Sequence, residues 1–248
     1  MLLMIASIIP MSFIFNGRDF FNSIAGRYLG QSDEGFGVLF NCNLFGFVNL
    51  QDVSLQYVLY TMTIFVAYLF MFGHFMSDNL NVSDIYVFIR ENKRTKWFVK
   101  ESAAIFLQST VVAIVNIAIV YFMTNKMSIE RAPTSIKQIA GIAVLTILYI
   151  WILAIATNFF SALFGSTIGL SVGAALHYVF VIIASYGYDT SIIKSVDPLA
   201  VVFNVAEGRQ SIISAVIIMS VILAIVCAVF CIYVNKADIS LKNKEIIM

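Results

Sequence analysis

The side chains of this chain that could take part in chemistry are few, and they lie in or beside hydrophobic stretches. His74 and His177 are the only histidines, and we expect no metal site around either of them. Cys42, Cys227 and Cys231 have no metal-ligand spacing, and the last two fall four residues apart within one apolar stretch. We therefore expect the cysteines to pack as ordinary residues of a hydrophobic interior.

The sequence motifs for nucleotide binding and for hydrolysis are absent. No glycine is followed by lysine, so the chain lacks the loop G-x-x-x-x-G-K-[ST] that holds nucleotide phosphates. It also lacks H-E-x-x-H and G-x-S-x-G, and its apolar stretches hold no pair of acidic residues that could serve as general acid and base. We therefore expect that the chain is not an enzyme, does not hydrolyse ATP itself and carries no cofactor.

Polar residues inside the apolar stretches are the remaining candidates for function. His74 lies near the end of such a stretch, where an amphipathic ring can rest at a membrane interface. His177 lies well inside another, so its ring either hydrogen-bonds a neighbouring helix or lines a water-filled pathway. Asn116 and Asn158 are further polar candidates for such a pathway.

The composition indicates the class of protein that holds these residues. Of the 248 residues, 60% are hydrophobic and only 12% are charged, and the mean hydropathy is +0.92. That leaves too little polar surface to cover a soluble globule, so we predict an all-α integral membrane protein embedded in the lipid bilayer. The formal net charge of +1 gives no footprint for a nucleic acid, and none is expected as a partner.

We expect six membrane-spanning helices that form a single transmembrane domain over residues 1–248. For the first span, a signal peptide is the alternative, although the basic region that begins such peptides is missing. Only a tight turn from Gly165 to Gly169 separates the fourth and fifth spans. The expected spans cover about residues 1–16, 56–75, 102–124, 138–164, 170–186 and 211–234.

The connection between the fifth and sixth spans, residues 187–210, is amphipathic rather than merely polar. Pro198 lies in its middle, where it would interrupt a helix because proline lacks the backbone N–H. This pattern predicts two half-helices that dip toward the membrane and return, which together make a re-entrant segment.

The stretch from Asp84 to Glu101 sets the topology. It holds five of the fifteen Lys and Arg residues of the chain, and basic loops mark the cytoplasmic side of a membrane protein. Six spans then place both termini in the cytoplasm. Ser83 and Asp84 are a plausible N-cap for a short cytoplasmic helix. The five basic residues are Arg90, Lys93, Arg94, Lys96 and Lys100.

The short helix expected after Asp84 would carry large apolar side chains at the cytoplasmic surface. Exposed aromatic residues on such a helix usually mark the site of a partner protein. A helix lying flat on the lipid, or a loop whose charge only fixes the topology, are the alternatives. The residues expected to dock a partner are Ile85, Tyr86, Phe88, Ile89, Arg90, Lys93 and Arg94.

Four features together resemble the membrane subunit of an ABC-2 type ATP-binding-cassette exporter, a permease with six spans and a separate ATPase. They are the segment I-Y-V-F-I-R-E-N-K-R-T-K-W-F-V-K, the near absence of a loop between spans four and five, the segment S-V-D-P-L-A-V-V-F, and the missing nucleotide motif. The first segment is similar to the family's coupling helix, which inserts into a cleft of the ATPase. The chain departs from the family in lacking a proline before the basic residues and an amphipathic helix ahead of the first span.

The resemblance implies a plasma-membrane permease that exports a hydrophobic or amphipathic substrate, such as an antimicrobial or other peptide, for secretion or for immunity in bacteria. A partner ATPase subunit would bind ATP and Mg²⁺, and a second permease chain, identical or related, would complete the path. The rival interpretation is a non-transporting membrane scaffold or sensor partner that docks a cytoplasmic protein through the basic loop. The assignment of the substrate rests on analogy alone.

Overall fold

The computed structural model describes residues 65–86, 94–127, 136–186, 195–206 and 208–236. Within these ranges the chain is helical and forms no strand, in agreement with the predicted all-α class. A helical stretch at 65–72 comes first. The helices that follow are α5 (Phe75–Tyr86), α6 (Arg94–Met127), α7 (Ile136–Phe164), α8 (Ser166–Tyr186), α10 (Pro198–Ala206) and α11 (Ile212–Lys236).

Four of the described helices, α6, α7, α8 and α11, are long and apolar enough to cross a membrane, which indicates a membrane protein. They correspond to the third to sixth predicted spans. α6 begins at Arg94 rather than near residue 102, because Lys, Arg and Glu are good helix formers and carry the helix beyond its apolar part. The first predicted span lies outside the described residues, and the second is described only from residue 65 onward.

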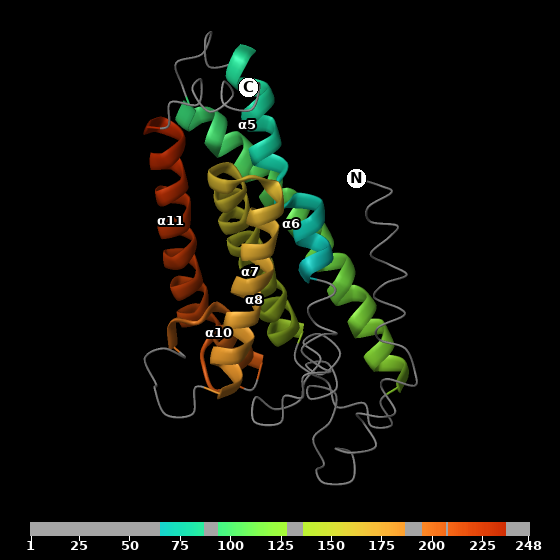
Figure 1. Ribbon diagram of the computed structural model, residues 1–248. Helices are drawn as coiled ribbons and strands as arrows, with labels where there is room; N and C mark the ends of the chain where they lie inside the picture. The colour runs from blue at the N-terminus through green and yellow to red at the C-terminus, as the bar shows by residue number, and fades with distance from the viewer. Residues whose placement is uncertain (1–64, 87–93, 128–135, 187–194, 207, 237–248) are drawn as a thin grey trace.

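α7 lies at the centre of the bundle. It contacts α5, α6, α8, α10 and α11. Its most apolar stretch is 56% buried, whereas that of α11 is only 22% buried, so α7 is the helix most enclosed by the others. Figure 1 shows the long helices running in alternating directions along the bundle. Side chains fixed on α7 are therefore in a position to reach most of the other helices.

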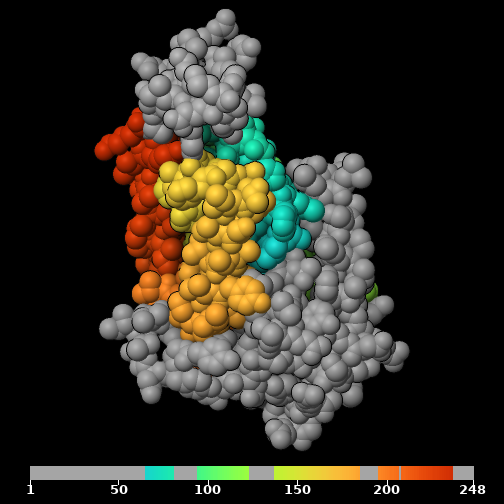
Figure 2. Space-filling model, in the orientation of Figure 1, coloured from blue at the N-terminus to red at the C-terminus, as the bar shows by residue number. Residues whose placement is uncertain are grey.

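α11 turns a regular apolar stripe away from the bundle. Its side chains at four-residue spacing lie on one face of the helix and are between 54% and 75% exposed. Figure 2 shows α11, in red, and α8, in gold, reaching the surface on one side of the molecule. Such a surface needs apolar surroundings, which a lipid bilayer supplies. The stripe consists of Ile213, Ile217, Val221 and Ile225.

The turn between α7 and α8 is a single residue, Gly165, whose φ of 95° lies in the left-handed region that favours glycine. α8 then returns along α7 at very short range. A Cβ atom added at Gly169 would collide with Ser161, and one added at Gly173 would collide with Thr157. Two glycines four residues apart allow this approach of helix backbones. The near absence of a loop between the fourth and fifth spans is thus confirmed.

The start of α6, the turn between α7 and α8, and the end of α11 share one end of the bundle (Figure 1). Arg94 Nη1 donates a hydrogen bond to the carbonyl oxygen of Val234 at 3.2 Å. Asn235 Nδ2 donates to Thr95 Oγ1 at 3.1 Å. These contacts join the basic start of α6 to the end of α11, as the predicted alternation of spans requires.

α10 lies against α7, α8 and α11 and is enclosed by them. All of its residues except Asn204 are buried. Residues 195–196 are also helical, and the helix is interrupted at Asp197, immediately before Pro198. Pro198 is the first residue of α10, a position where the missing N–H of proline does no harm. The predicted interruption at Pro198 is present, and most of the first half-helix lies outside the described residues.

Candidate functional site

A break in the predicted second span is the most unusual feature of the described bundle. The helix at 65–72 stops, Gly73 and His74 form a turn, and the chain becomes helical again at Phe75, where α5 begins. In a continuous helix the carbonyl of Phe72 would accept from the N–H of Met76, four residues later. A break leaves such backbone groups without their helical partners, and inside a membrane protein they must find others.

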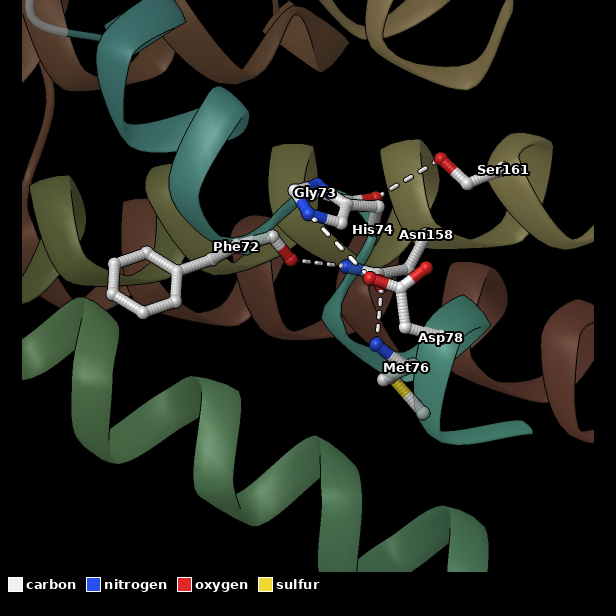
Figure 3. Close-up of polar contacts among 7 residues, drawn as sticks. All are labelled: Phe72, Gly73, His74, Met76, Asp78, Asn158 and Ser161. Atoms are coloured by element: carbon white, nitrogen blue, oxygen red, sulfur yellow. Dashed lines mark hydrogen bonds and ion pairs between the residues drawn. The ribbon is translucent and has the colours of Figure 1, made fainter. Parts of the chain in front are cut away.

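Asn158 of α7 supplies both missing partners (Figure 3). Its Nδ2 donates to the carbonyl oxygen of Phe72 at 2.7 Å, and its Oδ1 accepts from the N–H of Met76 at 2.7 Å. The side-chain amide therefore sits between two backbone groups that would otherwise bond each other. Nδ2 also donates to the carbonyl oxygen of Ala154 at 2.8 Å, which fixes the orientation of the amide on its own helix. Asn158 is fully buried, so all of these bonds are shielded from solvent.

Ser161, one turn further along α7, holds the next backbone group of the break. Its Oγ donates to the carbonyl oxygen of Gly73 at 3.1 Å. Gly73 is needed here because an added Cβ would lie 2.6 Å from Thr157 Cγ2 and 2.5 Å from the carbonyl oxygen of Leu69. The normal helical pattern resumes with the bond from the N–H of Asp78 to the carbonyl oxygen of His74 at 2.8 Å.

One turn of α7, residues 157–161, therefore connects two other helices. Asn158 and Ser161 hold the break in the second predicted span, while Thr157 and Ser161 receive the glycine face of α8. A movement of α5 about the break would change the contacts of these side chains. We call the residues Phe72, Gly73, Met76, Asn158 and Ser161 the helix-break site.

His74 lies on the outer side of this break. Its Nε2 is 3.5 Å from Asp78 Oδ2, and the two side chains are 33% and 57% exposed. The pair is thus half-exposed, and the position of His74 at a membrane interface stays a prediction. The described residues contain no group of three His, Cys, Asp or Glu side chains that could hold a metal ion.

His177 of α8 forms a second buried polar contact. Its Nδ1 is 2.5 Å from the hydroxyl oxygen of Tyr149 on α7, and both side chains are 1% exposed. The ring of Phe65 packs on the imidazole with its centroid at 4.8 Å. Of the two interpretations of His177 from the sequence, the structure places it in the helix-to-helix hydrogen bond. Its other nitrogen, Nε2, is buried and has no partner among the described residues.

Asp197 is a buried carboxylate near these groups. Its Oδ1 accepts from the N–H of Leu199 at 2.9 Å, so it caps the start of α10. Its Oδ2 is buried without a partner in the described part of the chain. Burial raises the pKa of Asp197 from 3.8 to about 7, and the backbone N–H groups of Leu199 and Ala200 oppose this in part.

The predicted docking residues fall at the limit of what the structure describes. Ile85 and Tyr86 are the last two residues of α5, and Arg94 is the first of α6. The expected N-cap at Ser83 and Asp84 is wrong, because α5 has already begun at Phe75 and passes through both. A separate coupling helix therefore stays a prediction. Phe88, Ile89, Arg90 and Lys93 lie outside the described residues.

The three predicted pathway residues are buried on three different helices. Asn116 is buried on α6, Asn158 holds the helix break, and His177 pairs with Tyr149. Sequence reasoning missed the break and the carboxylate of Asp197. The adjacent Gly73 and His74 within an apolar stretch, and the dipeptide Asp197-Pro198, which has the form of an N-cap followed by a first-turn proline, are the signals that could have found them.

Comparison with known proteins gives no relative for this arrangement. No protein-family model, no curated protein and no solved structure matches the chain.

Proposed function

We propose that this chain is the permease subunit of an ATP-binding-cassette exporter in the plasma membrane, with both termini in the cytoplasm. The observation that carries the proposal is the helix break at Gly73, because it gives α5 a defined pivot on α7. α5 leads into residues 87–93, where docking of an ATPase is expected, and α6 follows with Arg94, Lys96 and Lys100. A movement of residues 87–93, caused by the docked ATPase, would be transmitted to the bundle interior through α5.

The helix-break site can act as an element with two states. With Asn158 inserted, its amide satisfies the carbonyl of Phe72 and the N–H of Met76. If Asn158 withdraws, these two backbone groups can bond each other and make the helix continuous. Conformational changes in proteins use such discrete alternatives, because packed interiors do not deform gradually. Docking and release of the ATPase would bias the choice between the two states.

The proposal includes the partners that this mechanism needs. An ATPase subunit would supply ATP hydrolysis and bind the Mg²⁺, and a second permease chain would complete the path at an interface between the two. The substrate would be hydrophobic or amphipathic, such as an antimicrobial or other peptide. The mostly apolar bundle supports a hydrophobic or amphipathic substrate. The basic residues gathered at the start of α6 support docking of a cytoplasmic ATPase.

The test is purification of the tagged chain from detergent-solubilised native membranes, followed by assay of ATPase activity in the eluate. Phe88→Asp would place an unpaired charge in the ATPase cleft and should abolish co-elution or stimulation of the ATPase. The matched control is Gln210→Asp, which adds the same charge beside α11 at the opposite end of the bundle. It should leave both unchanged.

Two results would contradict the proposal. A chain that elutes without any ATPase would rule out the permease assignment, and a co-eluting protein without ATPase activity would favour the scaffold interpretation. If Phe88→Asp binds and stimulates its ATPase like the wild type, the docking assignment is wrong.

A further inference from the structure

α10 is buried along nearly all of its length, and its last residue is bonded to the first turn of α7. At the end, Gln138 Nε2, in the first turn of α7, donates to the carbonyl oxygen of Ala206 at 3.1 Å. A nine-residue helix rises about 13 Å, so Asp197, just before α10, lies about that far from this contact.

Three buried polar side chains belong to these elements, and two of them have incomplete hydrogen bonding. Tyr149 and His177 are 1% exposed and Asp197 is 5% exposed. His177 Nε2 and Asp197 Oδ2 are both buried and have no partner among the described residues. A buried polar atom without a partner is costly, and an ionised carboxylate is the most costly of all unless a cation or a proton compensates it.

No cation faces Asp197 in the described part of the chain. α7 contributes Tyr149 and α8 contributes His177, while the buried residues along α11 are Ala215, Met219, Leu223, Phe230 and Val234, none of which titrates. The described residues that follow in α10 are likewise uncharged. A proton would remove the charge here without needing a cavity or further ligands.

We propose that the buried carboxylate of Asp197 is a proton-binding site that holds α10 in the bundle. The carboxylate takes a proton from a hydronium ion, releases water and becomes a neutral carboxylic acid. Oδ1 continues to cap α10 through the N–H of Leu199, and the acid group at Oδ2 no longer carries a charge. The ligand is the proton itself, and the inference stands whether or not the chain is a transporter.

The direction of the pH effect follows from linkage. The pKa of Asp197 is raised from 3.8 to about 7 with α10 in place, so this packed state binds the proton more tightly than a state with α10 released. The packed state is therefore fully favoured below about pH 4. It is progressively weakened as the pH rises through the interval up to about 7, by at most tenfold in its equilibrium constant for each pH unit.

The experiment compares the full-length chain with Asp197→Asn in detergent, using infrared difference spectroscopy and hydrogen exchange of peptides covering residues 195–206. Asparagine keeps the oxygen that caps Leu199 but cannot ionise, so it should preserve the fold. The wild-type spectrum should contain a protonated-carboxyl band that disappears as the pH rises through the neutral range. The band should be absent from Asp197→Asn and retained in the control Asp78→Asn, which removes an exposed carboxylate.

Hydrogen exchange provides the second measurement. The two proteins are compared at the same pH. Near pH 7, residues 195–206 of the wild type should exchange faster than those of Asp197→Asn, and near pH 4 they should exchange at the same rate. If the neutral-range carboxyl band is the same in the wild type and in Asp197→Asn, or if the two proteins exchange alike at every pH, the proposal is wrong.

Discussion

Asn158 accepts a hydrogen bond from the backbone N–H of Met76 at 2.7 Å, across 82 residues of chain. The same side chain donates to the backbone carbonyl of Phe72, so one amide replaces a helical hydrogen bond and satisfies both of its ends. Insertion of a side chain into the helical hydrogen-bond pattern is one of the few causes of a sharp helix break. The helix break and Asn158 therefore form one structural unit.

Asn158→Leu should destabilise the fold more than Ser161→Ala. Hydrogen bonds between membrane helices contribute about 0.6 kcal/mol each on average. The leucine variant loses two of them, those to Phe72 and Met76, so we expect a loss of about 1.2 kcal/mol, whereas Ser161→Ala should lose about 0.6 kcal/mol. Unfolding of the detergent-solubilised proteins by denaturant measures both. Equal losses in the two variants would show that Asn158 does not hold the break.

The close approach of α7 and α8 predicts a sharp difference between two neighbouring substitutions. Gly173→Val should cost about 1–3 kcal/mol by overpacking, because an added Cβ collides with Thr157. Ser171→Val, on the exposed side of α8, should change stability little. Melting temperatures of the two variants provide the measurement, and a stable Gly173→Val protein would contradict the packing described here.

The contact between Tyr149 and His177 predicts a non-additive pair. His177→Leu leaves the Tyr149 hydroxyl buried without its partner and should cost about 1–3 kcal/mol. Adding Tyr149→Phe removes that hydroxyl, so the double variant should be more stable than the sum of the two single losses implies. A double-mutant cycle of unfolding free energies measures the coupling, and a coupling energy of zero would show that the contact contributes nothing.

The buried carboxylate of Asp197 predicts how stability depends on pH. Because its pKa is raised from 3.8 to about 7 in the folded chain, its contribution is most favourable at low pH and is lost as the pH rises through that interval. The wild type should therefore lose stability relative to Asp197→Asn between about pH 4 and 7, by at most about 4 kcal/mol. Parallel melting profiles of the two proteins over this interval would contradict the prediction.

Hydrophobicity predicted the long helices well, because a membrane-spanning helix needs a long run of apolar residues, which can be recognised locally. The four described spans, the turn at Gly165 and the interruption before Pro198 all follow from local patterns. The helix break does not, because the groups that hold it belong to Asn158 and Ser161, more than eighty residues away along the chain. The expected N-cap at Ser83 was also wrong. A local capping pattern does not show whether a helix has already begun upstream, as α5 has here.

The candidate residues show the same limit. Asn158 and His177 were singled out because polar side chains are rare inside spans, and each proves to make buried contacts with another part of the bundle. Their partners could not be foreseen, because Phe72, Met76 and Tyr149 are unremarkable in an apolar stretch. Asp197 was assigned to an amphipathic connection, and only the burial of α10 makes its carboxylate unusual.

The most direct test of the central claim is the ATPase activity of the complex purified from native membranes through the tagged chain, compared for the wild type, Asn158→Leu and the control Ser171→Ala. If α5 transmits motion through the helix-break site, an ATPase should co-elute with all three proteins. Its hydrolysis should then be strongly altered only with Asn158→Leu. The absence of a co-eluting ATPase, or equal activity in all three complexes, would contradict the account.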